Sequence, residues 1–147
     1  MINKLVNQLM VDEGSVTNDS GRHIAYLCPA DKWTIGYGIE VQDHGLSEKE
    51  AEDLLRQRVM AVVDEVHMNY PFIKSAPLPI KLSFYNMAYN LGITRLSKFK
   101  KMIAALEATD YLTASEEAKD SQWYNQVGER AERIVNIFKD SADKHFS

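Results

Sequence analysis

The sequence contains a single cysteine, Cys28, among its 147 residues. One cysteine excludes a disulfide bond within the chain, so the fold does not depend on an oxidising compartment. The Cys28 thiol therefore serves either as a small buried side chain or as a chemically active group.

Long hydrophobic runs are also missing. The longest apolar stretches, residues 59–63 and 103–106, are much shorter than the roughly 20 residues that span a bilayer. Residues 1–10 include Lys4 and three amide side chains, so they lack the continuous apolar core of a secretory signal. We expect no stable membrane insertion, and synthesis in the cytoplasm followed by release through another component.

Clusters of metal ligands and phosphate-binding loops are absent as well. The four histidines are scattered along the chain: His23, His44, His67 and His145. The sequence has no HExxH motif and no Walker-type loop, and nothing in it places a histidine beside Cys28 for a Cys-His hydrolase. We expect no metal ion and no cofactor.

Acidic residues are missing from residues 70–106, although the whole chain has a net charge of -4. This basic zone contains six cations: Lys74, Lys81, Arg95, Lys98, Lys100 and Lys101. Local positive charge in an acidic protein suits attraction to an anionic polymer such as a cell wall or a nucleic acid. A solvated helix face is an equally good interpretation.

The first third of the chain predicts a helix followed by a small sheet. Hydrophobic periodicity predicts a helix over residues 3–12, with Gly14 just past its end. After turn-forming residues, two stretches rich in β-branched and aromatic side chains, 24–28 and 33–41, predict an antiparallel sheet. Gly36 and Gly38 would weaken an ordinary strand, so we expect them to bend the backbone or to let a ligand approach closely.

Helical signals dominate the rest of the chain. Ser47 and Glu50 form a capping box that begins a helix over residues 47–69. Residues 80–91 are apolar almost all round, which predicts a buried central helix, and two further amphipathic stripes follow it.

The predicted architecture is one mostly helical α+β domain, residues 1–147, with two unequal lobes. About 14–46 form a small sheet lobe, about 47–69 form a connecting helix, and 1–13 with 70–147 form the helical lobe.

Two separated motifs resemble the phage lysozymes, a family of glycoside hydrolases. The first consists of Glu13-Gly14, then Cys28, then TIGYG at 34–38, and it is similar to members with cysteine at the second catalytic position. The second is WYNQ at 123–126 with two arginines beyond it, and residues 86–92 also resemble the family's central helix. The resemblance covers nearly the whole chain and implies a lysozyme-like fold.

The sequence departs from the family pattern at two places. Glu13 and Cys28 lie farther apart than in the family, so residues 15–21 are expected to enlarge the first turn of the hairpin. Ile39 stands where a histidine commonly follows TIGYG, which removes a polar contact used in relatives.

The resemblance implies that Glu13 is the general acid that protonates the departing sugar oxygen. Arg130 is expected to pair with Glu13 and to tune its proton affinity, and Arg133 is expected to pair with Asp12. Without the motif, Glu13 would be interpreted as a solvent-exposed acid near the C-terminal end of a helix.

The second catalytic group implied by the resemblance is Cys28. The thiol could assist attack by water, form a covalent glycosyl intermediate, or be an inert small side chain. Thr34 is expected to hold the attacking water beside Cys28. Asp19 and Asp31 are the alternative carboxylates, although both lie in turn-forming sequence.

Substrate contacts are expected from Tyr89 and Asn90, which match groove-facing positions of the family. Trp123 and Tyr124 are interpreted as core residues, because an aromatic pair between helices usually packs.

The resemblance implies a monomeric muramidase that cleaves the β-1,4 bond between N-acetylmuramic acid and N-acetylglucosamine in peptidoglycan. Such a protein would be made in the host bacterial cytoplasm during phage lysis and would reach the wall through a holin-type pore or a delivery machine. A virion-associated enzyme and a secreted effector are the alternative roles. A glycan-binding module without chemistry and a lytic transglycosylase remain alternatives, and no nucleic-acid partner is expected.

Overall fold

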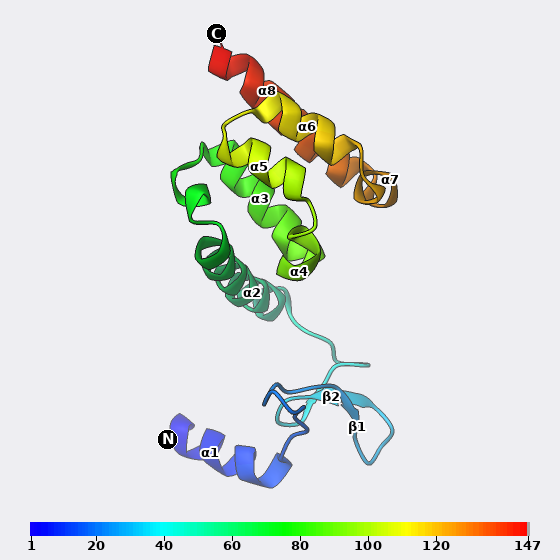
Figure 1. Ribbon diagram of the computed structural model, residues 1–147. Coiled ribbons are helices and arrows are strands. Elements are labelled where there is room, and N and C mark those ends of the chain that lie inside the picture. The colour runs from blue at the N-terminus through cyan, green and yellow to red at the C-terminus, as the bar shows by residue number, and fades with distance from the viewer. Residues whose placement is uncertain (147) are drawn as a thin grey trace. The chain divides into compact units, whose positions relative to one another are not determined.

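The computed structural model describes residues 1–146, which contain eight α-helices, one short 3-10 helix and a three-stranded sheet (Figure 1). This content confirms the predicted α+β class with a small antiparallel sheet. Contacts divide the chain into a first unit, Met1–Leu54, and a second unit that begins at Leu55. The predicted packing of residues 1–13 with the helical lobe stays a prediction.

Helix α1 (Ile2–Glu13) begins the first unit and ends where the sequence predicts. Gly14 follows it with a φ of 64°, a left-handed conformation that glycine adopts without strain, and its N–H donates to the Met10 carbonyl. This turn makes Glu13 the last residue of the helix. No side chain of α1 is buried.

Residues 15–25 form a small ordered hairpin before the sheet. Thr17 and His23 are bridged across it, and the Asn18 side chain accepts hydrogen bonds from the N–H groups of Ser20 and Arg22, both at 3.0 Å. The His23 ring lies edge-on to Tyr37, with 5.1 Å between ring centres. The hairpin that contains the added residues 15–21 therefore contacts the TIGYG segment through His23.

The sheet is built from three short strands in the order β1-β2-β3: β1 (Tyr26–Leu27), β2 (Trp33–Ile35) and β3 (Ile39–Glu40). Both pairings are antiparallel, and Thr34 lies opposite Tyr26 on one side and Glu40 on the other. The stretch 33–41 thus contributes two strands. The bend between them contains Gly36 and Gly38, at φ 61° and 77°, as the glycine pair predicts.

The long helix α2 (Glu48–Asn69) begins with the predicted capping box. The Ser47 N–H donates to the Glu50 carboxylate at 2.8 Å, and the Glu50 N–H donates to the Ser47 hydroxyl at 3.1 Å. Two otherwise unpaired N–H groups are satisfied in this way. The boundary between the two units falls within α2.

The second unit is helical. After η1 (Pro71–Ser75) come six helices: α3 (Leu78–Leu91), α4 (Ile93–Leu96), α5 (Lys100–Glu107), α6 (Tyr111–Lys119), α7 (Gln122–Val127) and α8 (Glu129–Phe146). Helix α6 packs against α5 and α8, and α3 also packs against α8 (Figure 1).

The hydrophobic core of the described chain lies from Val66 onward. Its largest fully buried side chains include Phe84 and Met87 of α3 and Phe138 of α8. The predicted central role of residues 80–91 is therefore confirmed. No helix among residues 1–146 combines the length and the apolar character that a membrane span requires.

Candidate active site

The side chain of Glu13 lies against the backbone of Gly38. A Cβ atom placed on Gly38 would lie 2.8 Å from Oε2 and 2.9 Å from Cδ of Glu13. The acid at the end of α1 and the turn of the TIGYG motif thus meet in the first unit. The group that approaches this glycine is a side chain of the same chain. The expected close approach of a ligand stays a prediction.

Cys28 occupies a tight turn between β1 and β2. Its N–H donates to the Lys32 carbonyl at 3.0 Å, and its carbonyl accepts from the Asp31 N–H at 2.8 Å. Backbone hydrogen bonds from Lys32 and then Ala30 lower the pKa of the Cys28 thiol, with a smaller contribution from the Thr34 hydroxyl. Desolvation and the Glu40 carboxylate oppose this shift. On balance the pKa of the Cys28 thiol lies below its usual value.

Thr34 is the buried residue of β2, with 2% of its surface exposed. Its hydroxyl donates to the Lys32 carbonyl at 2.9 Å and also interacts with the Cys28 thiol. The hydroxyl has one proton to donate and two lone pairs that accept, so it can contact Lys32 and Cys28 together. Thr34 and Cys28 are therefore brought together, while the water expected between them stays a prediction.

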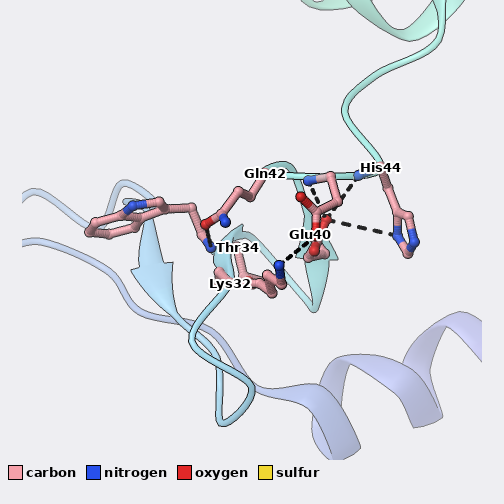
Figure 2. A network of polar contacts seen from close by, with 7 residues as sticks. Lys32, Thr34, Glu40, Gln42 and His44 are labelled. Carbon is pink, nitrogen blue, oxygen red and sulfur yellow. Dashed lines mark hydrogen bonds and ion pairs between the residues drawn. The ribbon is translucent and has the colours of Figure 1, made fainter.

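Glu40 is a candidate that the sequence reasoning missed. It lies directly across the sheet from Thr34, and its side chain is only 19% exposed (Figure 2). Its Oε2 accepts from the N–H groups of His44 and Asp43, both at 3.0 Å, and these bonds lower the pKa of Glu40. The sequence could have indicated Glu40, because residues 34 and 40 lie opposite each other if the turn between the strands is centred on residue 37.

Lys32 is also part of this polar network. Its Nζ forms an ion pair with Asp43 at 2.7 Å, next to the amides that Glu40 binds (Figure 2). The Gln42 side chain accepts from the Trp33 N–H at 3.2 Å and ties the segment after β3 back to β2. The segment that follows β3 is thus held to the sheet by charged and amide side chains.

The alternative carboxylates lie in turns, as predicted. Asp19 is exposed in the 15–25 hairpin, and Asp31 is exposed with a φ of 59°. That Asp19 or Asp31 substitutes for an inert Cys28 stays a prediction. Among the described residues, no group of three or more His, Cys, Asp or Glu side chains could hold a metal ion.

The predicted substrate residues lie at the end of α3 in the second unit. Trp123 donates from Nε1 to the Asn90 side chain at 3.1 Å, which orients the Asn90 amide. Tyr89 is 44% exposed. Trp123 is 4% exposed and Tyr124 packs against the core, so the interpretation of both as core residues is confirmed.

Arg130 of α8 is hydrogen-bonded to α3 one helical turn before Asn90. Its Nε donates to Oδ1 of Asn86 at 2.8 Å, and Asn86 precedes Asn90 by four residues on the same face of α3. The predicted pairs of Arg130 with Glu13 and of Arg133 with Asp12 each join residues of different units and stay predictions. Sequence reasoning missed Asn86 as the partner of Arg130.

Part of the basic zone lines a cavity of about 580 Å³ in the second unit. Four of its cations lie there, namely Arg95, Lys98, Lys100 and Lys101. Glu117 and Asp120 line the same cavity, together with Trp123. The cavity therefore presents charges of both signs beside an aromatic ring.

The family described as "Phage lysozyme" matches residues 17–137, which is most of the chain. The chain belongs to the phage lysozyme family. The matched range includes Cys28, Thr34, Tyr89, Asn90 and Arg130, whereas Glu13 precedes it.

Individual relatives of this phage lysozyme are distant. "Probable T4-type lysozyme 2" of Dictyostelium discoideum is 30% identical over 66 residues, which is 45% of this chain and 39% of the relative. "Probable T4-type lysozyme 1" of the same organism is 21% identical over 130 residues, covering 84% and 75% of the two chains.

A third relative is a larger phage protein. "Pre-baseplate central spike protein Gp5" of Enterobacteria phage T4 is 35% identical over 57 residues, which is 39% of this chain and 10% of the relative. The chain thus spans well under two thirds of the length of two of these three relatives. The cysteine subgroup within the family stays a prediction.

Proposed function

We propose that this phage lysozyme is a muramidase that hydrolyses the β-1,4 bond between N-acetylmuramic acid and N-acetylglucosamine in peptidoglycan. Glu13 acts as the general acid. The observation that supports this most directly is the contact of the Glu13 side chain with Gly38 of the TIGYG motif. The first unit, which ends at Leu54, contains all three proposed groups: the Glu13 carboxyl, the Cys28 thiol and the Thr34 hydroxyl.

The chemistry requires an acid and a second group. Glycoside cleavage passes through an oxocarbenium-like transition state, and protonation of the departing oxygen lowers its barrier. Glu13 donates that proton. Cys28, whose pKa is lowered by backbone hydrogen bonds, acts in its thiolate form near the Thr34 hydroxyl.

Two routes are open to the thiolate. As a general base it accepts a proton from water, and the water oxygen attacks the anomeric carbon with inversion. As a nucleophile it forms a carbon–sulfur bond to that carbon, and water later releases the sugar with net retention. The anomeric form of the first product distinguishes the routes.

The proposal includes a biological role, which membership of the phage lysozyme family supports. We place the protein in bacterial lysis by a phage, as a monomer made in the host cytoplasm that reaches the periplasmic wall through a holin-type pore. Coexpression with and without such a pore tests this: lysis should occur only with the pore. Lysis without one would contradict the proposed route.

The enzymatic proposal is tested by digesting purified peptidoglycan and analysing the products by mass spectrometry. We expect reducing N-acetylmuramic acid ends, and a loss of roughly 10²- to 10⁴-fold in rate for Glu13→Gln. Glu116→Gln, an exposed glutamate on α6, is the matched control and should keep full activity.

Other products would identify the alternatives. Anhydro sugars would indicate a lytic transglycosylase, and wall binding without new chain ends would indicate a glycan-binding module. Full activity of Glu13→Gln would remove Glu13 as the acid.

A further inference from the structure

Two glycines of one turn have the same backbone character and different surroundings. Gly36 and Gly38 both have positive φ, 61° and 77°. A Cβ on Gly36 would meet no atom within 4 Å, whereas a Cβ on Gly38 would meet Oε2, Cδ and Cγ of Glu13 at 2.8, 2.9 and 3.2 Å. Of these two glycines, only Gly38 has another residue's side chain in the space that its own Cβ would fill.

The atoms in that space are the end of the Glu13 side chain. The three nearest neighbours of the Cβ position all belong to Glu13 and none to the backbone. A methyl group at residue 38 would thus be accommodated by rotation of a flexible side chain, without displacing the turn. The carboxyl would then leave its position.

The turn that receives the carboxyl is itself fixed. It directly connects β2 to β3, whose register pairs Ile35 with Ile39 and Thr34 with Glu40. Tyr37, between the two glycines, is in edge contact with the His23 ring of the preceding hairpin. A group held against Gly38 is therefore held in a defined place relative to Thr34.

We infer that Gly38 is a positioning residue for the acid: its missing side chain leaves the space that holds the Glu13 carboxyl against the β2–β3 turn. This inference rests on the proposed role of Glu13. Displacement of a reacting group by about 1 Å can cost roughly 100-fold in rate. Gly38→Ala should therefore act on the chemical step.

The first experiment compares Gly38→Ala with Gly36→Ala. Both add one methyl group at positive φ, so both carry a similar backbone strain, and only the first overlaps Glu13. We expect similar losses in Tm, and a fall of roughly 10- to 100-fold in kcat with little change in KM for Gly38→Ala alone. Equal kcat for the two variants at equal folded fraction would overturn the inference.

The second experiment tests rescue. Glu13→Asp withdraws the carboxyl by one methylene group and should itself lower kcat. In a Gly38→Ala background the same substitution should cost much less, because the overlap has been relieved. Additive losses in this double-mutant cycle would contradict the inference, since a purely structural effect of Gly38→Ala is independent of the length of residue 13.

A third measurement separates this inference from the proposed function. The ¹³C resonance of the Glu13 carboxyl should shift in Gly38→Ala and stay in place in Gly36→Ala, whatever the activity. If Glu13→Gln remains active while this shift is observed, the assignment of the acid fails and the contact stands. If Glu13→Gln is inactive and neither kcat nor the resonance responds to Gly38→Ala, the positioning role fails and the proposed acid stands.

Discussion

Arg130 donates a hydrogen bond from its Nε to Oδ1 of Asn86, and the two residues are 44 positions apart in the sequence. The bond fixes a guanidinium group on α8 against α3. Within residues 1–146 this bond uses Nε, so the two terminal nitrogens of Arg130 can serve as further donors. Asn86 thus orients the arginine that the family resemblance assigns a supporting role.

Replacing Asn86 by Ala should loosen Arg130 without removing its charge. We expect a loss of about 1 kcal/mol in unfolding free energy, from the hydrogen bond, and a fall in kcat smaller than that of Arg130→Ala. Chemical denaturation and turnover of soluble peptidoglycan fragments measure the two effects.

Asn136→Ala, at an exposed position of α8, is the control and should change neither quantity. If Asn86→Ala and Arg130→Ala were equally inactive at equal stability, the arginine would depend entirely on Asn86. If Asn86→Ala kept full activity, orientation of Arg130 by Asn86 would be irrelevant to turnover.

The reactivity of Cys28 should depend on Glu40. Backbone hydrogen bonds from Lys32 and Ala30 lower the pKa of Cys28, while the negative charge of Glu40 raises it. Glu40→Gln removes that opposing charge, so the pKa of Cys28 should fall further. At a pH below this pKa, alkylation by iodoacetamide should become faster, and it reports on Cys28 alone because the chain has one cysteine.

The same change should move activity if the thiolate is the active form. Activity then rises with pH through the pKa of Cys28, and in Glu40→Gln this rise should lie at lower pH. Glu50→Gln is the matched control, since Glu50 also accepts a backbone N–H and its pKa is also lowered. An unchanged alkylation profile in Glu40→Gln would show that Glu40 does not act on the thiol.

Ser83 carries a buried hydroxyl without a hydrogen-bond partner in the described part of the chain. Burial of an unpaired hydroxyl is unfavourable, so Ser83→Ala should raise the unfolding free energy by about 1 kcal/mol. Ser115→Ala is the comparison, because Ser115 is equally buried and its hydroxyl donates to the Leu112 carbonyl at 2.6 Å. A stabilisation by Ser115→Ala as large as that by Ser83→Ala would refute the assignment to the missing partner.

Local signals in the sequence predicted much of this fold. The Ser47–Glu50 capping box needs only residues three apart, and it is formed as predicted. The bend at Gly36 and Gly38 also follows from local chemistry, because glycine alone adopts positive φ at low cost.

Contacts between distant residues were not predictable in the same way. Asn86 with Arg130 and Asn90 with Trp123 depend on how α3 packs beside α7 and α8, which periodicity does not specify. Glu40 was missed because its position opposite Thr34 depends on the register across a turn. A shift of one residue would place Glu40 on the other face of the sheet.

The hydrogen bond between His67 and Tyr85 links α2 to α3 at 2.5 Å and supports a last prediction. Tyr85→Phe removes the hydroxyl and should lower the unfolding free energy by about 1 kcal/mol.

Burial raises the pKa of Tyr85, so the neutral phenol is favoured in the folded state. This contribution is complete below the unfolded pKa of about 10 and is lost as pH rises through the folded value. The difference between the wild type and Tyr85→Phe should therefore shrink above about pH 10, as urea unfolding at several pH values would measure. Tyr89→Phe, at an exposed position of the same helix, is the comparison variant. A constant difference across that range would show that ionisation of Tyr85 does not contribute to alkaline unfolding.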